Sequence, residues 1–449
     1  MRVLGIACAV LIVIGAAGTT RAADPFLRRT PAVRAVEKVG PSVVSITTEE
    51  LASSRNPFGS VFGNDPTFER FFRDFFEPQA PRERRRANLG SGVLIDDRGH
   101  VLTNAHVVAR ASRVQVVLAD GRELDATVVG ADPNNDVAVL QVESDESLPW
   151  TPPGDSDDVL VGEPVIAIGN PFGLSNTVTT GVISAVDRSL RTGNRVYHGF
   201  LQTDASINPG NSGGPLLNAE GQLIGVNTAI YQGAEGIGFA IPIAVASRVV
   251  RELLEHGEVL PVWLGLQFQE LDEPLREAMG LPLRTRGALV TQVRKGGPAA
   301  HGGVERGDVV THVDGRAVES AREFYERLSL TTQGQALALG LLRDAQKRSA
   351  RVVAEEIPGS LVDELASQLL GVELEPLPRG GFSVSKVRPG SGSEQIGLRP
   401  GDVILRINGL PLVDRDALER SVLDLRGRER AILVVGRGRG RYHVTIPLT

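Results

Sequence analysis

The chain has 449 residues, of which 41% are hydrophobic and 23% charged, with a net charge of −6. This length exceeds what one compact core organises, so we expect two to four domains. The acidic balance argues against a general nucleic-acid-binding protein. The 51 glycines and 27 prolines indicate many turns, and therefore strand-rich domains.

Residues 1–22 have the pattern of a secretory signal peptide. A positive start precedes an apolar run, Val3–Ala17, and small residues follow it. We predict cleavage near Ala22 and export to a bacterial periplasm. A membrane anchor is the alternative, but the run is short for a stable membrane span. The single cysteine, Cys8, lies in this segment, so the mature chain would have no disulfide, thiolate metal site or cysteine nucleophile.

A strand predicted at 42–47 is followed by an aromatic segment, residues 51–88, that we interpret as an insertion. A run of basic residues at 82–86 within it is best explained as a solvated loop edge. The aromatic side chains favour either contact with another subunit or an unfolded client, or packing of a short helix on its own domain. Half of the chain's 14 phenylalanines lie here: Phe58, Phe62, Phe68, Phe71, Phe72, Phe75 and Phe76.

Residues 90–241 have an all-β pattern. Short apolar runs separated by turn residues are typical of a barrel or sandwich, and a helix is predicted afterwards at 243–256, with a hinge at 257–261. The predicted strands are 93–95, 101–103, 114–118, 127–129, 137–142, 165–168, 177–186, 223–226 and 238–241.

The C-terminal residues contain an internal repeat with a constant offset of 94 residues. We interpret the matches as two copies of one small domain, each with a helix after its Gly-Asp-Val strand, at 322–328 and 417–423. The matched residues are Gly287, Val290, Val293, Gly296, Gly303, Gly307, Asp308, Val309 and Gly315, repeated as Gly381, Val384, Val387, Gly390, Gly397, Gly401, Asp402, Val403 and Gly409.

Three short motifs favour nucleophilic catalysis. The Thr103–Val107 motif ends a strand at His106, Asp136 heads an apolar strand, and Ser212 lies among glycines in Gly210–Pro215. The order His, Asp, Ser is that of chymotrypsin-like enzymes and differs from the subtilisin and α/β-hydrolase orders. We therefore predict that Ser212 attacks a carbonyl, His106 transfers the proton, and Asp136 orients the imidazole.

The same glycine-rich turn predicts an oxyanion hole. Its donors would be backbone N–H groups in the stretch Gly210, Asn211 and Ser212, chiefly those of Gly210 and Ser212. Pro209 is excluded because proline has no N–H. No metal-ligand cluster or phosphate-binding loop is evident, so we expect neither a metal nor a cofactor.

The motifs at 103–107, 135–140, 202–205 and 207–217 resemble those of the HtrA (Do-like) family of periplasmic serine proteases. The resemblance covers nearly the whole chain. It implies a mainly β fold, with a trypsin-like double barrel of two six-stranded barrels followed by two PDZ domains. It also implies trimers, larger cages on unfolded substrate, and a protease–chaperone role in protein quality control.

Further residues are assigned through the resemblance. Ile207 and Ile230 match pocket-lining positions, which implies a shallow pocket and cleavage after Val, Ala, Ile or Thr. The loop 187–199, with Arg188 and Arg191, matches a sensor loop whose regulatory role is a hypothesis.

PDZ domains add a peptide strand to a sheet edge and take its terminal carboxylate into a backbone nest. The loop expected to do so in the first copy is Trp263-Leu264-Gly265-Leu266, and the matching candidate in the second is 369–372. For the second copy, a structural or cage-building role stays open.

These expectations give a signal peptide at 1–22, a protease domain at 23–256, and PDZ domains at 257–355 and 360–449. The predicted function is ATP-independent endoproteolysis of unfolded periplasmic proteins and peptides by a homo-oligomer, without nucleic acid. One alternative is a chaperone or PDZ scaffold with minor proteolysis. Another is a regulatory protease with one folded target, against which the two PDZ copies and the aromatic segment argue.

Overall fold

The computed structural model describes residues 28–49, 86–109, 111–171, 173, 176–192, 195–208, 210–228, 236–378, 380–438 and 440–448. The predicted signal peptide, residues 51–85 of the predicted insertion, and Ile230 lie outside the described residues.

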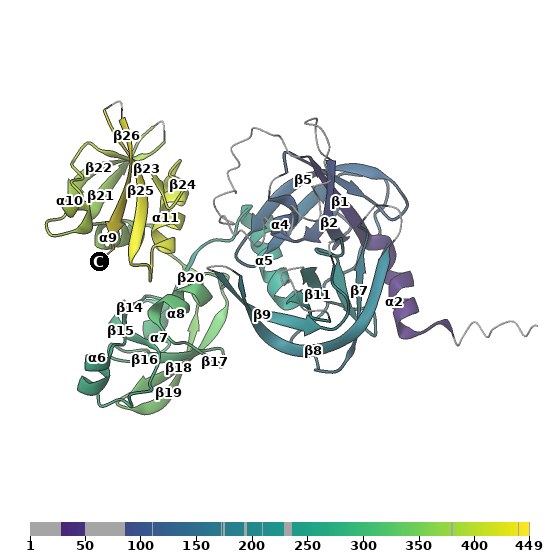
Figure 1. The fold of residues 1–449 in the computed structure, drawn as a ribbon, viewed down its shortest axis with the longest axis horizontal. Coiled ribbons are helices and arrows are strands. Elements are labelled where there is room, and N and C mark those ends of the chain that lie inside the picture. The colour runs from purple at the N-terminus through teal and green to yellow at the C-terminus, as the bar shows by residue number, and fades with distance from the viewer. Residues whose placement is uncertain are drawn as a thin grey trace, which may run out of the picture.

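The N-terminal half forms two closed six-stranded antiparallel barrels, which lie side by side in Figure 1. The first has the strand order β1-β2-β3-β6-β5-β4, and the second β10-β11-β12-β9-β8-β7. This confirms the mainly β class and the double barrel. The strands are β1 Val43–Glu49, β2 Arg86–Leu94, β3 His100–Thr103, β4 Arg113–Val117, β5 Glu123–Asp132, β6 Val137–Val142, β7 Pro164–Gly169, β8 Thr177–Thr192, β9 Arg195–Thr203, β10 Pro215–Asn218, β11 Leu223–Thr228 and β12 Gly238–Pro242.

The β8–β9 hairpin corrects one expectation. Residues 187–199, expected as a loop, lie mostly in strands, because β8 continues to Thr192 and β9 begins at Arg195. Asp187 takes a positive φ of 61°, and the β8–β9 register shifts between Ala185 and Arg188. The family resemblance implies a loop here, but backbone pairing between β8 and β9 extends the hairpin into this stretch.

Two helices pack against the double barrel. Helix α2 (Pro31–Val39) begins where Thr30 accepts a hydrogen bond from the Val33 N–H and proline fills the first turn. Helix α5 (Ile243–His256) has the predicted bounds, ends at Gly257 with φ 77°, and buries its apolar face against both barrels. A short 3₁₀ turn, η1 (Gly40–Ser42), connects α2 to β1.

The two repeat copies fold as separate six-stranded sheets, β14-β15-β16-β18-β19 with β17, and β21-β22-β23-β25-β26 with β24. Their strands in the first copy are β14 Leu266–Glu270, β15 Ala288–Val293, β16 Val309–Val313, β17 Arg316–Ala317, β18 Ala336–Arg343 and β19 Gln346–Val353. In the second they are β21 Val372–Pro376, β22 Phe382–Val387, β23 Val403–Ile407, β24 Leu410–Pro411, β25 Arg430–Arg437 and β26 Gly440–Pro447. A two-stranded sheet of β13 (Val262–Trp263) and β20 (Glu355–Glu356) lies where the first copy begins and ends.

Each copy carries a helix after its Gly-Asp-Val strand, as predicted: α8 (Ala321–Leu328) and α11 (Arg415–Asp424). Ser320 and Asp414 cap these helices at their N-termini. Short helices α6 (Glu273–Ala278), α7 (Pro298–His301) and α10 (Gly392–Gln395) complete the copies. The sequence did not predict α9 (Gly359–Leu370), which connects the two copies.

The repeat also preserves an ion pair. Asp308 accepts hydrogen bonds from the Arg343 guanidinium at 2.7 and 2.8 Å, and Asp402 accepts from Arg437 at 2.7 and 2.6 Å. In each copy the same arginine also donates to a glycine carbonyl, that of Gly303 or Gly397. The pair therefore ties the turn before the Gly-Asp-Val strand to a neighbouring strand.

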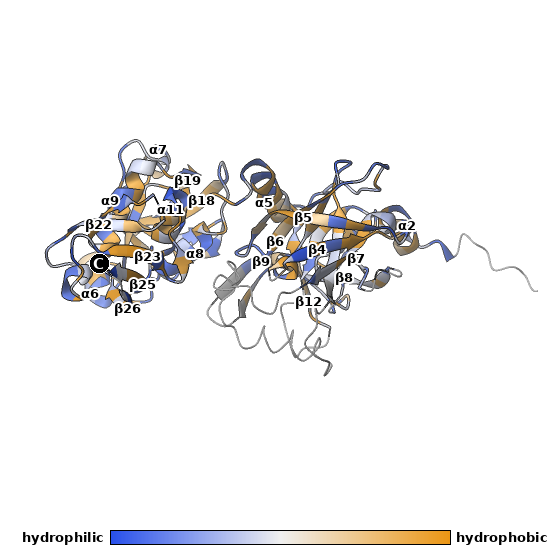
Figure 2. Ribbon diagram, turned by 90° about the horizontal axis from the view of Figure 1, so that it is seen from above, coloured by the Kyte–Doolittle hydropathy of each residue, from blue (hydrophilic) through white to orange (hydrophobic). Residues whose placement is uncertain are grey.

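Apolar residues lie mainly on the strands, many of which are orange in the hydropathy colouring of Figure 2. They form separate main clusters in the double barrel, the first copy and the second copy. Among the described residues, no helix is both long and apolar enough to span a membrane.

Candidate active site

The helical turn α4 (Ala105–Val108) carries His106. It follows β3 of the first barrel, and Asn104 precedes it in an extended conformation. Asn104 is fully buried, and its Nδ2 donates to the Asp136 carbonyl at 3.0 Å. The strand end and this bond fix where the imidazole lies.

Asp136 lies in the turn between β5 and β6, with a positive φ of 54°. Asp132 shapes this turn by accepting hydrogen bonds from the N–H groups of Asn134 and Asn135 and from the Asn135 side chain. Burial raises the pKa of Asp132, although these hydrogen bonds oppose the shift. The turn presents the Asp136 carboxylate to His106.

Ser212 lies between β9 and β10 of the second barrel, in a turn that requires glycine on both sides. Gly210 has a φ of 106° and Gly213 a φ of 84°. A Cβ on Gly213 would lie 2.2 Å from the Ser91 carbonyl and 2.4 Å from Thr103 Oγ1. The turn is therefore pressed against the first barrel, and this places Ser212 beside His106.

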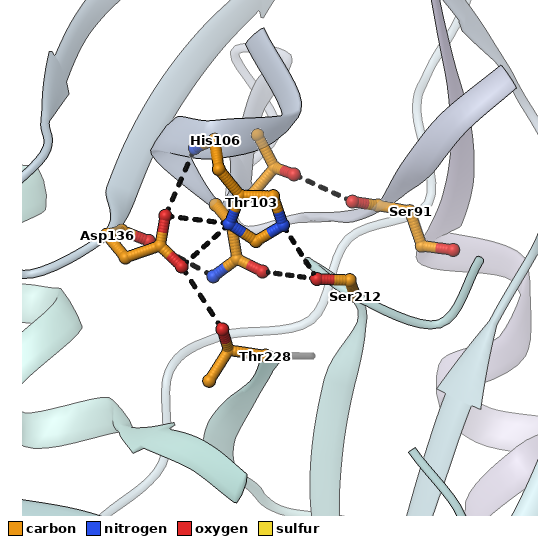
Figure 3. A network of polar contacts seen from close by, with 7 residues as sticks. Ser91, Thr103, His106, Asp136, Ser212 and Thr228 are labelled. Atoms are coloured by element: carbon orange, nitrogen blue, oxygen red, sulfur yellow. Dashed lines mark hydrogen bonds and ion pairs between the residues drawn. The ribbon is translucent and has the colours of Figure 1, made fainter. Parts of the chain in front are cut away.

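A continuous hydrogen-bonded chain connects the three predicted side chains (Figure 3). His106 Nδ1 lies 2.9 and 2.8 Å from the two Asp136 carboxylate oxygens, and the His106 backbone N–H donates to Asp136 Oδ1 at 3.1 Å. On the other side of the ring, His106 Nε2 lies 3.0 Å from Ser212 Oγ. The chain crosses from one barrel to the other, so both must be folded for it to form.

Three further residues belong to this network, and sequence reasoning assigned no role to them. Thr228 donates to Asp136 Oδ2 at 3.1 Å, and Ser212 Oγ also lies 3.0 Å from Asn104 Oδ1. Ser91 donates to the Gly210 carbonyl at 2.5 Å and accepts from the Asn170 N–H. Asn104 could have been noticed within the histidine motif, but Thr228 and Ser91 have no local signal, because they lie far from the motifs in sequence.

The backbone N–H groups of the serine turn differ in availability. The Asn211 N–H donates to the Asn208 carbonyl at 3.1 Å, so it is already engaged. The N–H groups of Gly210 and Ser212 have no acceptor within the described part of the chain. Of the stretch expected to form the oxyanion hole, Gly210 and Ser212 therefore retain free donors.

Ile207 is half-buried, packs against the core of the second barrel and contacts Gly238. The other expected pocket residue, Ile230, lies outside the described residues. In the described ranges, no group of three or more His, Cys, Asp or Glu side chains could hold a metal ion.

The residues of the loop expected to bind a carboxylate in the first PDZ copy lie in different surroundings. Gly265 has a φ of 78°, and the N–H groups of Leu264 and Gly265 have no acceptor among the residues described. Trp263, in contrast, lies in β13 and packs in the apolar cluster of the second copy. The second copy differs from expectation, because Leu369 and Leu370 form the last turn of α9 rather than a loop.

A double β-barrel with a Ser–His–Asp chain between the barrels, followed by PDZ domains, defines a chymotrypsin-like serine protease. Residues 90–226 match the trypsin-like peptidase domain family, and residues 262–353 and 383–437 match PDZ domain families.

Full-length relatives give the same result. The chain is 38% identical over 441 residues to the probable periplasmic serine endoprotease DegP-like of Halomonas elongata, covering 92% of each chain. It is 38% identical over 421 residues to the periplasmic serine endoprotease DegP of Salmonella typhimurium, covering 87% of this chain and 86% of that one. A solved HtrA-type protease, an AlgW variant with a decapeptide, is 39% identical with a TM-score of 0.51, over 73% of this chain and 98% of the other. The chain belongs to the HtrA family of DegP-like serine endoproteases.

Proposed function

We propose that Ser212, His106 and Asp136 are the catalytic triad of an endopeptidase that degrades unfolded proteins. The observation that carries this proposal is the hydrogen-bonded chain from Ser212 Oγ through the imidazole to the Asp136 carboxylate. A serine hydroxyl is a weak nucleophile until a base removes its proton, and His106 Nε2 is within reach to do so.

The reaction has two stages. Ser212 Oγ attacks the peptide carbonyl while His106 takes its proton, and the resulting imidazolium is stabilised by Asp136. His106 then gives the proton to the leaving amine, and water hydrolyses the acyl-enzyme by the reverse path. The N–H groups of Gly210 and Ser212 would stabilise the oxyanion, each contributing about 100- to 1000-fold in rate. ATP takes no part.

The substrate assignment rests on the expected pocket and on the PDZ copies. Ile207, with Ile230, would leave a shallow apolar pocket, which favours cleavage after Val, Ala, Ile or Thr. The free N–H groups at Leu264 and Gly265 support binding of a substrate C-terminus by the first PDZ copy. The names of the relatives support a periplasmic location, and the family resemblance supports a homotrimer or a multiple of it.

The test is digestion of reduced, unfolded casein by the purified mature protein. Wild type should cleave it without ATP, and Ser212→Ala should reduce the rate at least about 1000-fold with an unchanged circular dichroism spectrum. Continued cleavage by Ser212→Ala would exclude the triad assignment. Negligible wild-type turnover, with full suppression of client aggregation by Ser212→Ala, would instead favour the chaperone alternative.

A further inference from the structure

Helix α9 lies where a peptide would bind in the second PDZ copy. β21 is one of the two edge strands of its sheet, and α11 is the helix that follows the Gly-Asp-Val strand. A peptide strand would add to this edge beside this helix. α9 instead packs against both β21 and α11. Its buried side chains, which join the apolar cluster of the second copy, are Leu361, Val362, Leu365, Ala366 and Leu370.

The backbone of the two carboxylate loops shows the same difference. Gly265 and Gly371 are equivalent, because their carbonyls accept from Arg294 and Arg388 N–H groups that are 94 residues apart. In the first copy the Gly265 N–H has no acceptor among the described residues. In the second, the Gly371 N–H donates to the Ser367 carbonyl at 3.1 Å and thereby caps α9. A carboxylate entering the second loop would have to displace this bond.

Polar contacts hold α9 at both ends. At its N-terminal end, Arg415 of α11 donates to Asp363 at 2.6 Å and to the Gly359 carbonyl at 2.8 Å. At its C-terminal end, Ser393 Oγ donates to the Leu370 carbonyl at 2.5 Å. The helix is thus fixed to the second copy by apolar packing in its middle and by hydrogen bonds at its ends.

The opposite face of α9 reaches the first copy beside its carboxylate loop. Glu364 accepts from the Arg294 guanidinium at 2.7 Å, and Gln368 accepts from Gln267 of β14 at 2.8 Å. The backbone of Arg294 lies directly beside Gly265, because its N–H donates to the Gly265 carbonyl and its Cβ is close to that glycine. A carboxylate of α9 therefore already pairs with a cation beside the first loop.

We propose that α9 is the built-in occupant of the second PDZ peptide site and that its Glu364 competes with a substrate carboxylate for Arg294 at the first. Each chain then binds one peptide C-terminus, at the first copy, and Glu364 competes with the carboxylate of that peptide. This proposal rests on the proposed peptide binding by the first PDZ copy.

The test uses the full-length protein with Ser212→Ala, so that the peptide is not cleaved. A labelled decapeptide ending in valine is titrated with a free C-terminal carboxylate and, separately, as its amide. We expect one free-acid peptide per chain. We expect Glu364→Gln to tighten its binding about two- to five-fold, the range for a partly exposed ion pair, without tightening the amide. The matched control is Asp363→Asn, which neutralises the neighbouring acid of α9 facing Arg415 and should leave the affinity unchanged.

The possible negative results of this experiment can be distinguished from one another. Two free-acid peptides per chain would overturn the occupancy of the second site. Equal affinities of wild type and Glu364→Gln, or an equal gain in Asp363→Asn, would overturn the competition while leaving the first site intact. No binding of the free-acid peptide to any variant would overturn the proposed function of the first copy, and with it this proposal.

Discussion

At the residue scale, the hydroxyl proton of Ser212 has two acceptors. His106 Nε2 and Asn104 Oδ1 both lie 3.0 Å from Ser212 Oγ, and Asn104 is held by its bond to the Asp136 carbonyl. A hydroxyl has one proton to donate. It can therefore donate either to the imidazole or to the Asn104 side chain. Asn104 thus competes with His106 for the hydroxyl proton, while it also holds the turn that carries Asp136.

Substituting Asn104→Ala removes that second acceptor. We expect kcat/KM for a short peptide to fall about three- to ten-fold, because the hydrogen bond that holds the Asp136 turn is lost as well. Rates of cleavage at pH 7 measure this. Asn104→Asp keeps an acceptor near Ser212 but cannot donate to the Asp136 carbonyl, so it should lose at least as much activity, and unchanged activity in both variants would refute the role.

A substitution at Gly213 tests whether the serine turn is held by close packing in addition to its backbone conformation. Gly213→Ala would place a Cβ 2.2 Å from the Ser91 carbonyl, so we expect activity to fall at least about 100-fold while secondary structure is retained. Gly121→Ala is the control, because Gly121 has a similar φ of 89° but open space around it. That variant should lose only about 1 kcal/mol of stability and keep its activity. Similar activities of the two variants would contradict the packing argument.

At the scale of elements, the repeated Asp–Arg pair stabilises each PDZ copy separately. In the second copy, the hydrogen bonds from Arg437 hold the pKa of Asp402 below its ordinary value, although burial opposes the shift. A carboxylate with a lowered folded pKa contributes stability above its unfolded pKa. The contribution disappears as the pH falls through the folded pKa, that is, below about pH 4.

We expect Asp402→Asn to lower the melting temperature of the second copy by roughly 5 °C at pH 7 and to flatten its loss of stability below pH 4. Trp263 packs in the apolar cluster of this copy, so its fluorescence, in a Trp150→Phe background, reports on the transition. Asp424→Asn, which removes an exposed pair with Arg428, serves as the control. Parallel pH curves of wild type and Asp402→Asn would contradict the prediction.

At the scale of the whole molecule, two contacts orient the first PDZ copy on the double barrel. Glu252 of α5 is buried and accepts from the N–H groups of Leu260 and Gln333, at 3.0 and 2.7 Å, which joins helix, hinge and PDZ copy. Arg316 of β17 donates to Asp187 of β8 at 2.7 Å. Beside it, burial and the charge of Arg327 lower the pKa of His198. The β8–β9 hairpin thus lies against the PDZ copy.

Substituting Glu252→Ala leaves two N–H groups unpaired, each costing about 1–3 kcal/mol, so we expect the first PDZ copy to loosen from the barrel. Thermolysin cleavage before Leu260 should become several-fold faster, and the radius of gyration in X-ray scattering should rise. Glu255→Ala changes an exposed acid on the same helix and should change neither quantity. Unchanged cleavage in Glu252→Ala would show that other contacts suffice.

Local sequence signals were sufficient for the features that depend on nearby residues. Strand-length apolar runs between glycine turns predict the mainly β class, the 94-residue offset predicts the repeats, and the motif order predicts His106, Asp136 and Ser212 as the triad. The partners that surround these three residues depend on the tertiary fold. Thr228 and Ser91 reach the site through pairing across distant strands, and the Asn211 N–H is lost to a turn bond. The stretch expected as the second carboxylate loop is the end of α9. This helix is stabilised by packing of its apolar face against β21 and α11, which local sequence signals do not reveal.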